Sequence, residues 1–344
     1  MNRIDRRTVL AGSGALASAA LAAPLAAQGQ SPPLLAGKSF LVTGCSSGFG
    51  NLGAILYARL GARVFATMRN MPRPQAEELR AFAHDQKLDI TVLELDVLSD
   101  RLVAKAAGEA ERLNGGPIDV LVNNAGINIG GPVEVQDMEA MRLSFDTNVF
   151  GQQRLMRAVL PGMRSKKAGL IVNVSSQQGR IIMPHGGIYS ATKFAVESMS
   201  EQIAYELAPH GIEVTIIEPG GFPTNIGANR ARLTSALASR IEPRHADGYP
   251  EMVAQMGTRP ESLPTGKAMQ EAVARAYGGK APDPMDVPRA IAEIAAMPAG
   301  TRPLRRPVHP GNKPQLEINR VSAETQRNLL SRPPYADWAK AVLD

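Results

Sequence analysis

Tyr189 and Lys193, in the segment Y-S-A-T-K, are the residues whose types and spacing most directly indicate chemistry. Residues four apart on a helix project from the same face one turn apart, so the phenol and the ammonium would lie side by side. A nearby positive charge favours the ionised form of a phenol, which makes Tyr189 a candidate proton donor and acceptor near neutral pH. Ser176 precedes Tyr189 by 13 residues, and this combination is more informative than Tyr-x-x-x-Lys alone.

A glycine-rich turn, T-G-C-S-S-G-F-G, places Gly44, Gly48 and Gly50 in the spacing G-x-x-x-G-x-G. Glycines let a backbone bend sharply and approach a pyrophosphate, and a following helix offers its N-terminal amides and positive dipole end. The turn follows an apolar run and precedes an amphipathic one, which is the context that a dinucleotide site requires. We therefore expect a bound dinucleotide at this turn.

Apolar runs alternate with amphipathic stretches along most of the chain. The runs predict strands at Ser39–Thr43, Arg63–Met68, Ile90–Leu95, Val120–Asn123, Leu170–Ser175 and Glu213–Glu218. The stretches between them predict helices at Gly48–Leu60, Pro74–Gln86, Asp100–Leu113, Asp137–Ser165 and Gly187–Pro209. High Val, Ile and Leu content is typical of a parallel sheet buried on both faces, and the alternation predicts right-handed βαβ units.

The pattern changes after Thr224. Residues 225–285 contain scattered Pro, Gly, Arg and Met with short helical pieces such as Met269–Tyr277, which predicts a substrate lid rather than a second core. A helix at Asp286–Met297 and an edge strand at Leu304–Val308 would complete the domain. We expect the fold class α/β, with a single doubly wound Rossmann domain over residues 37–310 and a mainly parallel sheet. Residues 311–344 would form a tail packed on the domain or on a partner subunit.

The first 27 residues are typical of a secretory leader. Met1–Arg7 is basic, the following run to Ala27 is uncharged and Ala-rich, and Arg6-Arg7 resembles a twin-arginine export signal. We expect cleavage near Ala27, a linker over residues 28–36 and export to a bacterial periplasm. The alternative is an uncleaved anchor helix or a plain tail; without a working leader the protein would stay in the cytoplasm, and only an uncleaved leader would bring it to a membrane.

The composition of the chain bears on which classes of function and site it can have. The chain has 344 residues, a formal net charge of +6, and 4% aromatic residues. Without a basic block, this composition gives no support for nucleic-acid binding. The single cysteine, Cys45, excludes an intrachain disulfide framework. The five histidines have no metal-like spacing and are expected to be structural or at the surface, although His185 is a candidate for substrate contact.

Several further motifs follow in order: N-N-A-G at residues 123–126, Asn148 in D-T-N-V-F-G, and Pro219-Gly220. With the glycine turn, Ser176 and Tyr-x-x-x-Lys, they resemble the short-chain dehydrogenase/reductase family over residues 37 to 225. Among its members, 17β-hydroxysteroid and retinol dehydrogenases have the most similar motifs. The resemblance implies an oxidoreductase that interconverts a carbonyl and a secondary alcohol by hydride transfer.

The resemblance also implies roles for individual residues. Tyr189 would transfer a proton to or from the substrate oxygen, while Lys193 would lower its pKa and bind the nicotinamide ribose. Ser176, which the spacing selects over Ser175, would orient the carbonyl. Asn148 would hold a water in a proton relay that ends near Lys193.

The cofactor preference follows from the end of the second strand, where Arg69 succeeds Met68. An enzyme that prefers NAD usually has a carboxylate there, whereas a guanidinium suits a 2′-phosphate. We therefore expect NADP(H) rather than NAD(H), although Arg69 could also be an ordinary solvated arginine. Asp96 would bind the adenine amino group, cap the next helix, or do both. The full expected cofactor set is Gly44, Ser46, Ser47, Gly48, Phe49, Gly50, Arg69, Asp96, Val97, Asn124, Ala125, Gly126, Tyr189, Lys193, Pro219, Gly220, Phe222 and Thr224.

The motifs leave the substrate open, because it depends on residues 127–135, 181–188 and 225–285. Met256 and Met269 in the lid would suit an apolar small molecule. Two other functions remain: epimerisation or dehydration with a tightly held cofactor, and nucleotide sensing without turnover. Family members are commonly dimers or tetramers, and we expect the helices at 137–165 and 187–209 to form that interface.

Overall fold

The computed structural model describes residues 33–257, 268, 271–272, 274–275 and 281–343. Within them, seven strands form one sheet in the order β3-β2-β1-β4-β5-β6-β7, and every neighbouring pair is parallel. The strands are β1 (Ser39–Val42), β2 (Arg63–Met68), β3 (Ile90–Glu94), β4 (Val120–Asn123), β5 (Gly169–Val174), β6 (Ile212–Pro219) and β7 (Arg305–Val308). The predicted doubly wound α/β fold is confirmed, and each predicted strand is present within one or two residues of its expected bounds.

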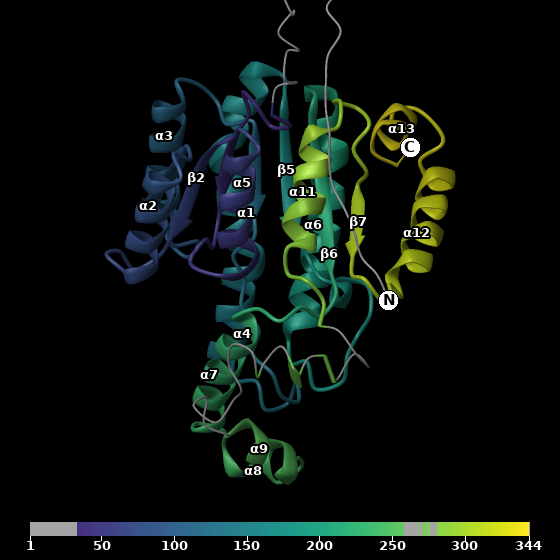
Figure 1. Cartoon of the computed structure of the whole chain (residues 1–344). Coiled ribbons are helices and arrows are strands. Elements are labelled where there is room, and N and C mark those ends of the chain that lie inside the picture. The colour runs from purple at the N-terminus through teal and green to yellow at the C-terminus, as the bar shows by residue number, and fades with distance from the viewer. Residues whose placement is uncertain (1–32, 258–267, 269–270, 273, 276–280, 344) are drawn as a thin grey trace, which may run out of the picture. The chain divides into compact units, whose positions relative to one another are not determined.

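Helices cover both faces of the sheet (Figure 1). One face packs against α1 (Gly48–Arg59), α2 (Pro74–Asp85) and α11 (Asp286–Ala296). The other packs against α3 (Asp100–Asn114), α5 (Gly151–Lys166) and α6 (Tyr189–Leu207). Because both faces are covered, all four residues of β1 and all four of β4 are buried, which explains why three of the four residues in each strand are apolar.

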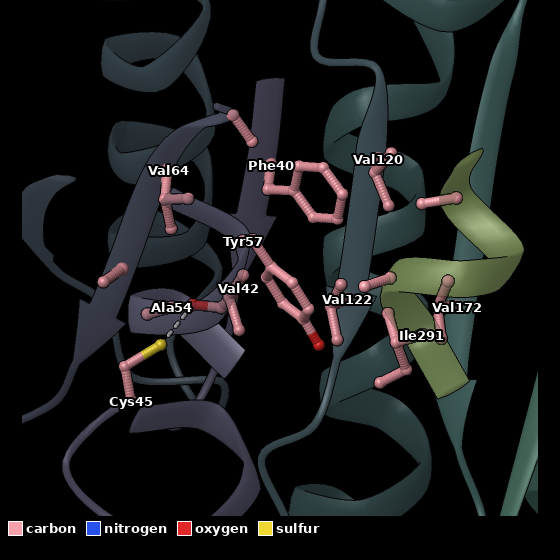
Figure 2. Close-up of a cluster of buried hydrophobic side chains, with 14 of the residues drawn as sticks. Phe40, Val42, Cys45, Ala54, Tyr57, Val64, Val120, Val122, Val172 and Ile291 are labelled. Carbon is pink, nitrogen blue, oxygen red and sulfur yellow. Dashed lines mark hydrogen bonds between the residues drawn. The ribbon is translucent and has the colours of Figure 1, made fainter. Parts of the chain in front are cut away.

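The core between the sheet and α1 shows how these side chains interlock (Figure 2). Phe40 of β1 stacks on Tyr57 of α1 with ring centroids 4.8 Å apart, and Ile291 of α11 belongs to the same buried cluster. Burial of each large apolar side chain contributes about 1.5–3 kcal/mol. This core fixes α1, and therefore the glycine turn that leads into it.

The helix expected over Asp137–Ser165 is interrupted. The structure has α4 (Met138–Phe145), a wider π-helical turn at Asp146–Phe150, and then α5. The prediction of one uniform helix was wrong at this turn, because apolar periodicity does not reveal a local change in helical pitch. Such turns are rare and often occur at functional sites, and this one contains Asn148.

The lid and the tail are both helical where the structure describes them. In the lid, α7 (Ile226–Ala238), α8 (Pro243–Ala246) and α9 (Pro250–Met256) are described, and Met256 is buried against Ile127 and Ile129 in a small third core. The expected helix at Met269–Tyr277 lies largely outside the described residues, as does the leader.

The tail forms α12 (Gln315–Leu329) and α13 (Ala336–Leu343); α12 lies along β7 and α13 contacts α6 (Figure 1). Among the residues that the structure describes, no helix combines the length and apolarity needed to cross a bilayer.

Candidate active site

The site lies where the chain reverses its direction across the sheet, between β1 and β4. Ligands of open α/β folds bind beyond the carboxyl ends of strands at such a point. Thr43 joins the two strand ends, because its hydroxyl accepts hydrogen bonds from the amides of Asn124 and Ala125, each at 3.0 Å. A cavity of about 490 Å³ opens here.

The glycine turn has the shape of a backbone cradle. Gly44 and Gly48 adopt positive φ angles of 75° and 57°, which favour glycine. A side chain at Gly50 would place its Cβ 2.5 Å from the carbonyl oxygen of Gly44. The cradle leads directly into the N-terminus of α1, where the first helical amides are available to an anion. This geometry fits the pyrophosphate of a dinucleotide.

Two guanidinium groups line the cavity next to the end of β2. Arg69 follows Met68, and Arg73 precedes α2 with its Nη1 donating to the carbonyl oxygen of Arg69 at 3.2 Å. The nearby carboxylate of Glu94 accepts a hydrogen bond from the amide of Met71 at 3.3 Å and is not among the lining residues. The end of β2 is thus positively charged on its cavity side.

Asp96 also lines the cavity, but it does not cap α3. Its Oδ1 accepts from the amide of Leu98 at 3.0 Å, while Ser99 is the capping residue and accepts from Leu102. The expectation that Asp96 caps the helix was wrong, because the turn of Asp96 onto Leu98 moves the start of α3 further along the chain.

Ser176, Tyr189 and Lys193 line the same cavity and are all buried. Ser176 follows β5, and Tyr189 is the first residue of α6, so Lys193 lies one turn further along. The amine of Lys193 donates to the carbonyl oxygen of Val174 at 2.8 Å and lies 5.6 Å from the centroid of the Tyr189 ring. The three predicted side chains are therefore brought together.

The pKa values of Tyr189 and Lys193 differ from those expected from their charges alone. Burial raises the pKa of Tyr189 to about 12, although its hydrogen bond with Ser176 acts in the opposite direction. Burial also lowers the pKa of Lys193 to about 8, and the nearby charge of Glu197 opposes that change. Burial is the larger cause for Tyr189, and it acts against the lowering of the Tyr189 pKa that was expected from Lys193. Tyr189 keeps its proton at neutral pH.

Asn148 lies beside the cavity without lining it, and its side chain is fully buried. Its Nδ2 donates to the carbonyl oxygen of Ile127 at 2.9 Å and to the hydroxyl of Thr192 at 3.0 Å. The π-helical turn thus connects the end of β4 to α6 through one amide side chain. A Cβ at Gly126 would lie 3.2 Å from Asn148 Oδ1 and 3.9 Å from Lys193 Nζ, so Asn148 and Lys193 face the same narrow space.

The loop after β6 forms another wall of the cavity. The amide of Gly220 donates to Val308 at 3.0 Å, and Phe222 packs edge-on against Phe49 of the glycine turn at 5.5 Å. His309 packs edge-on against Phe222 from the other side at 5.6 Å. This aromatic contact holds the Pro219–Thr224 loop against the start of α1.

The cavity contains nearly all of the predicted site residues. Gly50 and Asn148 do not line it; the first shapes the turn and the second braces the wall. His185 and Met256 are also not among the residues that line the cavity. In the described part of the chain, no group of His, Cys, Asp and Glu is arranged to hold a metal ion.

Several lining residues were not predicted. Arg73 is the residue before α2, beyond the end of β2. The local sequence pattern does not reveal that its side chain turns back toward the cavity. The substrate side was expected only as ranges, and these ranges contain the lining residues Met183, Asn225, Ile226, Asn229, Arg232 and Leu233. Gln178 also lines the cavity and lies outside the expected ranges.

A family model described as short chain dehydrogenase matches residues 38–233. The chain belongs to the short chain dehydrogenase family. Human retinol dehydrogenase 8 is 32% identical over 308 residues, covering 86% of this chain and 91% of that protein. The 3-ketodihydrosphingosine reductase of Bacteroides thetaiotaomicron is 37% identical over 192 residues, covering 55% of this chain and 66% of that enzyme.

Solved structures of short chain dehydrogenases are also similar. One from Streptomyces avermitilis has a TM-score of 0.60 and 30% identity, covering 86% of this chain and 98% of that one. An actinorhodin polyketide ketoreductase, solved with NADPH, has a TM-score of 0.63 and 26% identity, covering 79% of this chain and 95% of that one. The match to the first relatives is partial, since it spans 66% of the Bacteroides reductase and 58% of bovine retinol dehydrogenase 8.

Proposed function

We propose that this protein is an NADP(H)-dependent oxidoreductase that interconverts a carbonyl and a secondary alcohol, with Tyr189 as general acid and base. The observation that carries the proposal is one cavity lined by Ser176, Tyr189 and Lys193 and also by the glycine cradle and two arginines. A nicotinamide held beside the Pro219–Thr224 loop would supply or accept the hydride.

The residues of the chain supply orientation and the proton. In the direction of reduction, the Tyr189 phenol donates its proton to the carbonyl oxygen, and a pKa of about 12 ensures that this proton is present at neutral pH. The Ser176 hydroxyl donates a second hydrogen bond to the same oxygen, which polarises the carbonyl. Arg69 and Arg73 would bind a 2′-phosphate, because a guanidinium matches the geometry of phosphate oxygens.

The substrate side of the cavity supports a lipophilic carbonyl or alcohol as the substrate class. Met183, Ile226 and Leu233 line it, and Ile182 and Met183 are exposed at 73% and 50%. Exposed apolar side chains beside a cavity favour binding of an apolar molecule. The names of two relatives, a retinol dehydrogenase and a 3-ketodihydrosphingosine reductase, support the same class.

Nucleotide binding and turnover together test the proposal. NADPH and NADH are titrated by nicotinamide fluorescence, and NADPH is expected to bind at least about tenfold more tightly, a difference of about 1.4 kcal/mol. Consumption of NADPH is then followed with retinal, a long-chain 3-ketone and a small polar ketone. A purified protein that retains a non-exchanging nucleotide and oxidises no added NADPH would favour epimerisation or dehydration instead. Binding without any turnover would favour a sensor, and no binding of either nucleotide would overturn the proposal.

We also propose export through the leader, which lies outside the described residues. The support is the twin-arginine-like segment at Arg6 and Arg7. Residues 1–27 fused to a folded reporter should carry it to the periplasm, and replacement of both arginines by lysine should keep the reporter in the cytoplasm. Export that is indifferent to both arginines would contradict the twin-arginine route.

Self-association through α5 and α6 completes the proposal. Phe150, at the junction with α5, and Phe194 of α6 are exposed at 52% and 40% in the single chain. Light scattering after gel filtration should give a dimer or tetramer, and Phe194→Glu should reduce its mass. A monomer in the unsubstituted protein would contradict this part.

A further inference from the structure

Four functional groups lie at successive four-residue steps along α6: Tyr189, Lys193, Glu197 and Glu201. Residues at this spacing share one helix face, so the two acids continue the row that begins with the catalytic candidates. All four side chains are buried, and Glu197 is only 2% exposed. Carboxylates are rarely buried unless they are paired, so this row requires a partner from elsewhere in the fold.

That partner is Arg305 of β7. Its Nε lies 2.9 Å from Glu197 Oε2, and its Nη2 lies 2.6 Å from Glu201 Oε2. The sheet register explains this position: Arg305 is opposite Ile216, so its side chain emerges on the same face of the sheet as Glu218, two residues further along β6. Arg305 Nε is 3.7 Å from Glu218 Oε1.

Helix α12 closes this cluster from the outside. Asn319 Nδ2 donates to both carboxylate oxygens of Glu218, at 3.0 and 2.7 Å. Gln315, which is fully buried, donates to the main-chain oxygen of Glu218 at 3.3 Å. Glu218 immediately precedes Pro219, so α12 is bonded to the residue from which the cavity loop departs.

Glu197 also packs beneath the turn that carries Ser176. A Cβ at Gly179 would lie 2.9 Å from Glu197 Cγ and 3.1 Å from the main-chain oxygen of Lys193. Only a glycine leaves room for this approach, so Glu197 is held between the Ser176 turn and α6. It is therefore adjacent to both elements that carry the proposed catalytic groups.

Burial raises the pKa of Glu197, while the charges of Arg305 and Arg180 and the hydrogen bond from Arg305 act to lower it and favour the carboxylate. The cations Lys193, Arg180 and Arg305 face the carboxyl groups of Glu197, Glu201 and Glu218, and Tyr205 donates to Glu201 at 2.9 Å. Burial and the charge of Glu197 raise the pKa of Glu218 to about 8, which shows that the acids also compete with one another. Removal of one charge from a buried set leaves its partners uncompensated, with large effects on their protonation.

We propose that Glu197, held in place by Arg305, is a positioning residue that keeps Lys193 protonated and fixed, and that the Glu218–Asn319 contact links helix α12 to this function. The inference rests on the proposed function for its catalytic meaning, since Lys193 matters to turnover only if the site transfers hydride. The protonation of Lys193 itself can be measured without any substrate.

The sign of the effect follows from the surroundings of Lys193. Burial lowers the pKa of Lys193 to about 8, and the negative charge of Glu197 opposes that lowering. Replacement of Glu197 by glutamine removes the opposing charge, so the Lys193 pKa should fall further. The lysine would then lose its cationic form at the pH where the intact protein retains it.

The experiment is an NMR titration of the full chain labelled with ¹³C at the lysine ε carbon. The Lys193 signal is assigned by its loss in Lys193→Arg, and its pKa is compared between the unsubstituted protein, Glu197→Gln and Glu206→Gln. Glu206 lies on the same helix but is exposed, so its variant should leave the pKa unchanged. An unchanged Lys193 pKa in a folded Glu197→Gln protein would overturn the positioning role, whether or not any carbonyl is reduced.

Asn319→Ala tests the link to α12 and serves if Glu197→Gln fails to fold. Loss of both hydrogen bonds should raise the Glu218 pKa further, because those bonds act to lower it. A protonated Glu218 no longer opposes the charge of Glu197, so the Lys193 pKa should rise slightly, opposite in sign to the effect of Glu197→Gln, and an unchanged value would overturn the link. If turnover is found, the pH at which activity changes should follow the measured Lys193 pKa in each variant, whereas a purely structural role would lower activity equally at every pH.

Discussion

Asn148 and Ile127 exchange two hydrogen bonds: the amide of Ile127 donates to Asn148 Oδ1 at 2.8 Å, and Asn148 Nδ2 donates to the Ile127 carbonyl at 2.9 Å. The Asn148 side chain thus pairs with both main-chain polar groups of Ile127, which lies beyond the end of β4, as a neighbouring strand would. The π-helical turn places this amide opposite the end of β4. Asn148 is therefore part of the frame of the cavity as well as a proposed member of its proton relay.

Asn148→Ala should lower stability and activity together. Both Ile127 main-chain groups would lose their partner inside the protein, and each buried unpaired group costs about 1–3 kcal/mol. Urea denaturation should show a lower free energy of unfolding, while Asn114→Ala, at a partly exposed turn, should change it less. A fully stable variant with unchanged turnover would contradict both roles.

Tyr189→Phe should remove turnover and preserve the fold. The ring remains to fill its buried position, but the hydroxyl that donates the proton is lost, and general acid catalysis contributes about 10²–10⁴-fold. The rate of NADPH consumption is the measurement, with nucleotide titration as the check on binding. Tyr57→Phe, in the core between α1 and the sheet, is the control and should retain its rate. Persistent turnover in Tyr189→Phe would refute the proposed mechanism.

Arg69→Ala and Arg73→Ala should each weaken NADPH binding with little effect on NADH. Hydrogen bonds to charged groups contribute about 1.5–3 kcal/mol, so each loss should be about ten- to a hundredfold. Fluorescence titration of both nucleotides gives the ratio. Arg80→Ala, on the exposed side of α2 and paired with Glu77, is the matched control. Equal losses for NADPH and NADH would show that these arginines do not read the 2′-phosphate.

Gly50→Ala should abolish nucleotide binding and reduce stability. Its Cβ would lie 2.5 Å from the Gly44 carbonyl oxygen, so the cradle must shift, at a cost of about 1–3 kcal/mol. Gly108→Ala provides the opposite case, because that glycine lies inside α3 with open space around it. The free energy of unfolding of Gly108→Ala should rise by about 0.5–1 kcal/mol, and this variant should bind nucleotide normally. Normal binding by Gly50→Ala would mean that the turn is not the cradle.

Local sequence patterns were sufficient to predict the strands of the sheet and most of the residues that line the cavity. Strands such as β4 are apolar at almost every position because helices cover both faces, and motif residues such as Ser176 lie at strand ends that the fold must bring together. The cluster around Arg305 was not predicted, since its partners lie about a hundred residues away and nothing local marks an arginine as buried. The π-helical turn and the place of Arg73 were missed for a similar reason: both depend on tertiary packing.

Cys45 gives the glycine turn a natural chemical reporter. It is the single cysteine of the chain, it is fully buried within the turn, and its thiol contacts the Val42 carbonyl oxygen at 3.3 Å (Figure 2). Burial raises its pKa to about 12, so the reactive thiolate is scarce until the turn opens. The rate at which an alkylating reagent labels the protein therefore measures how often this segment opens. A nucleotide bound to the cradle should slow that labelling. The alkylation rate of the Cys45 thiol would therefore report nucleotide binding even when no turnover is observed.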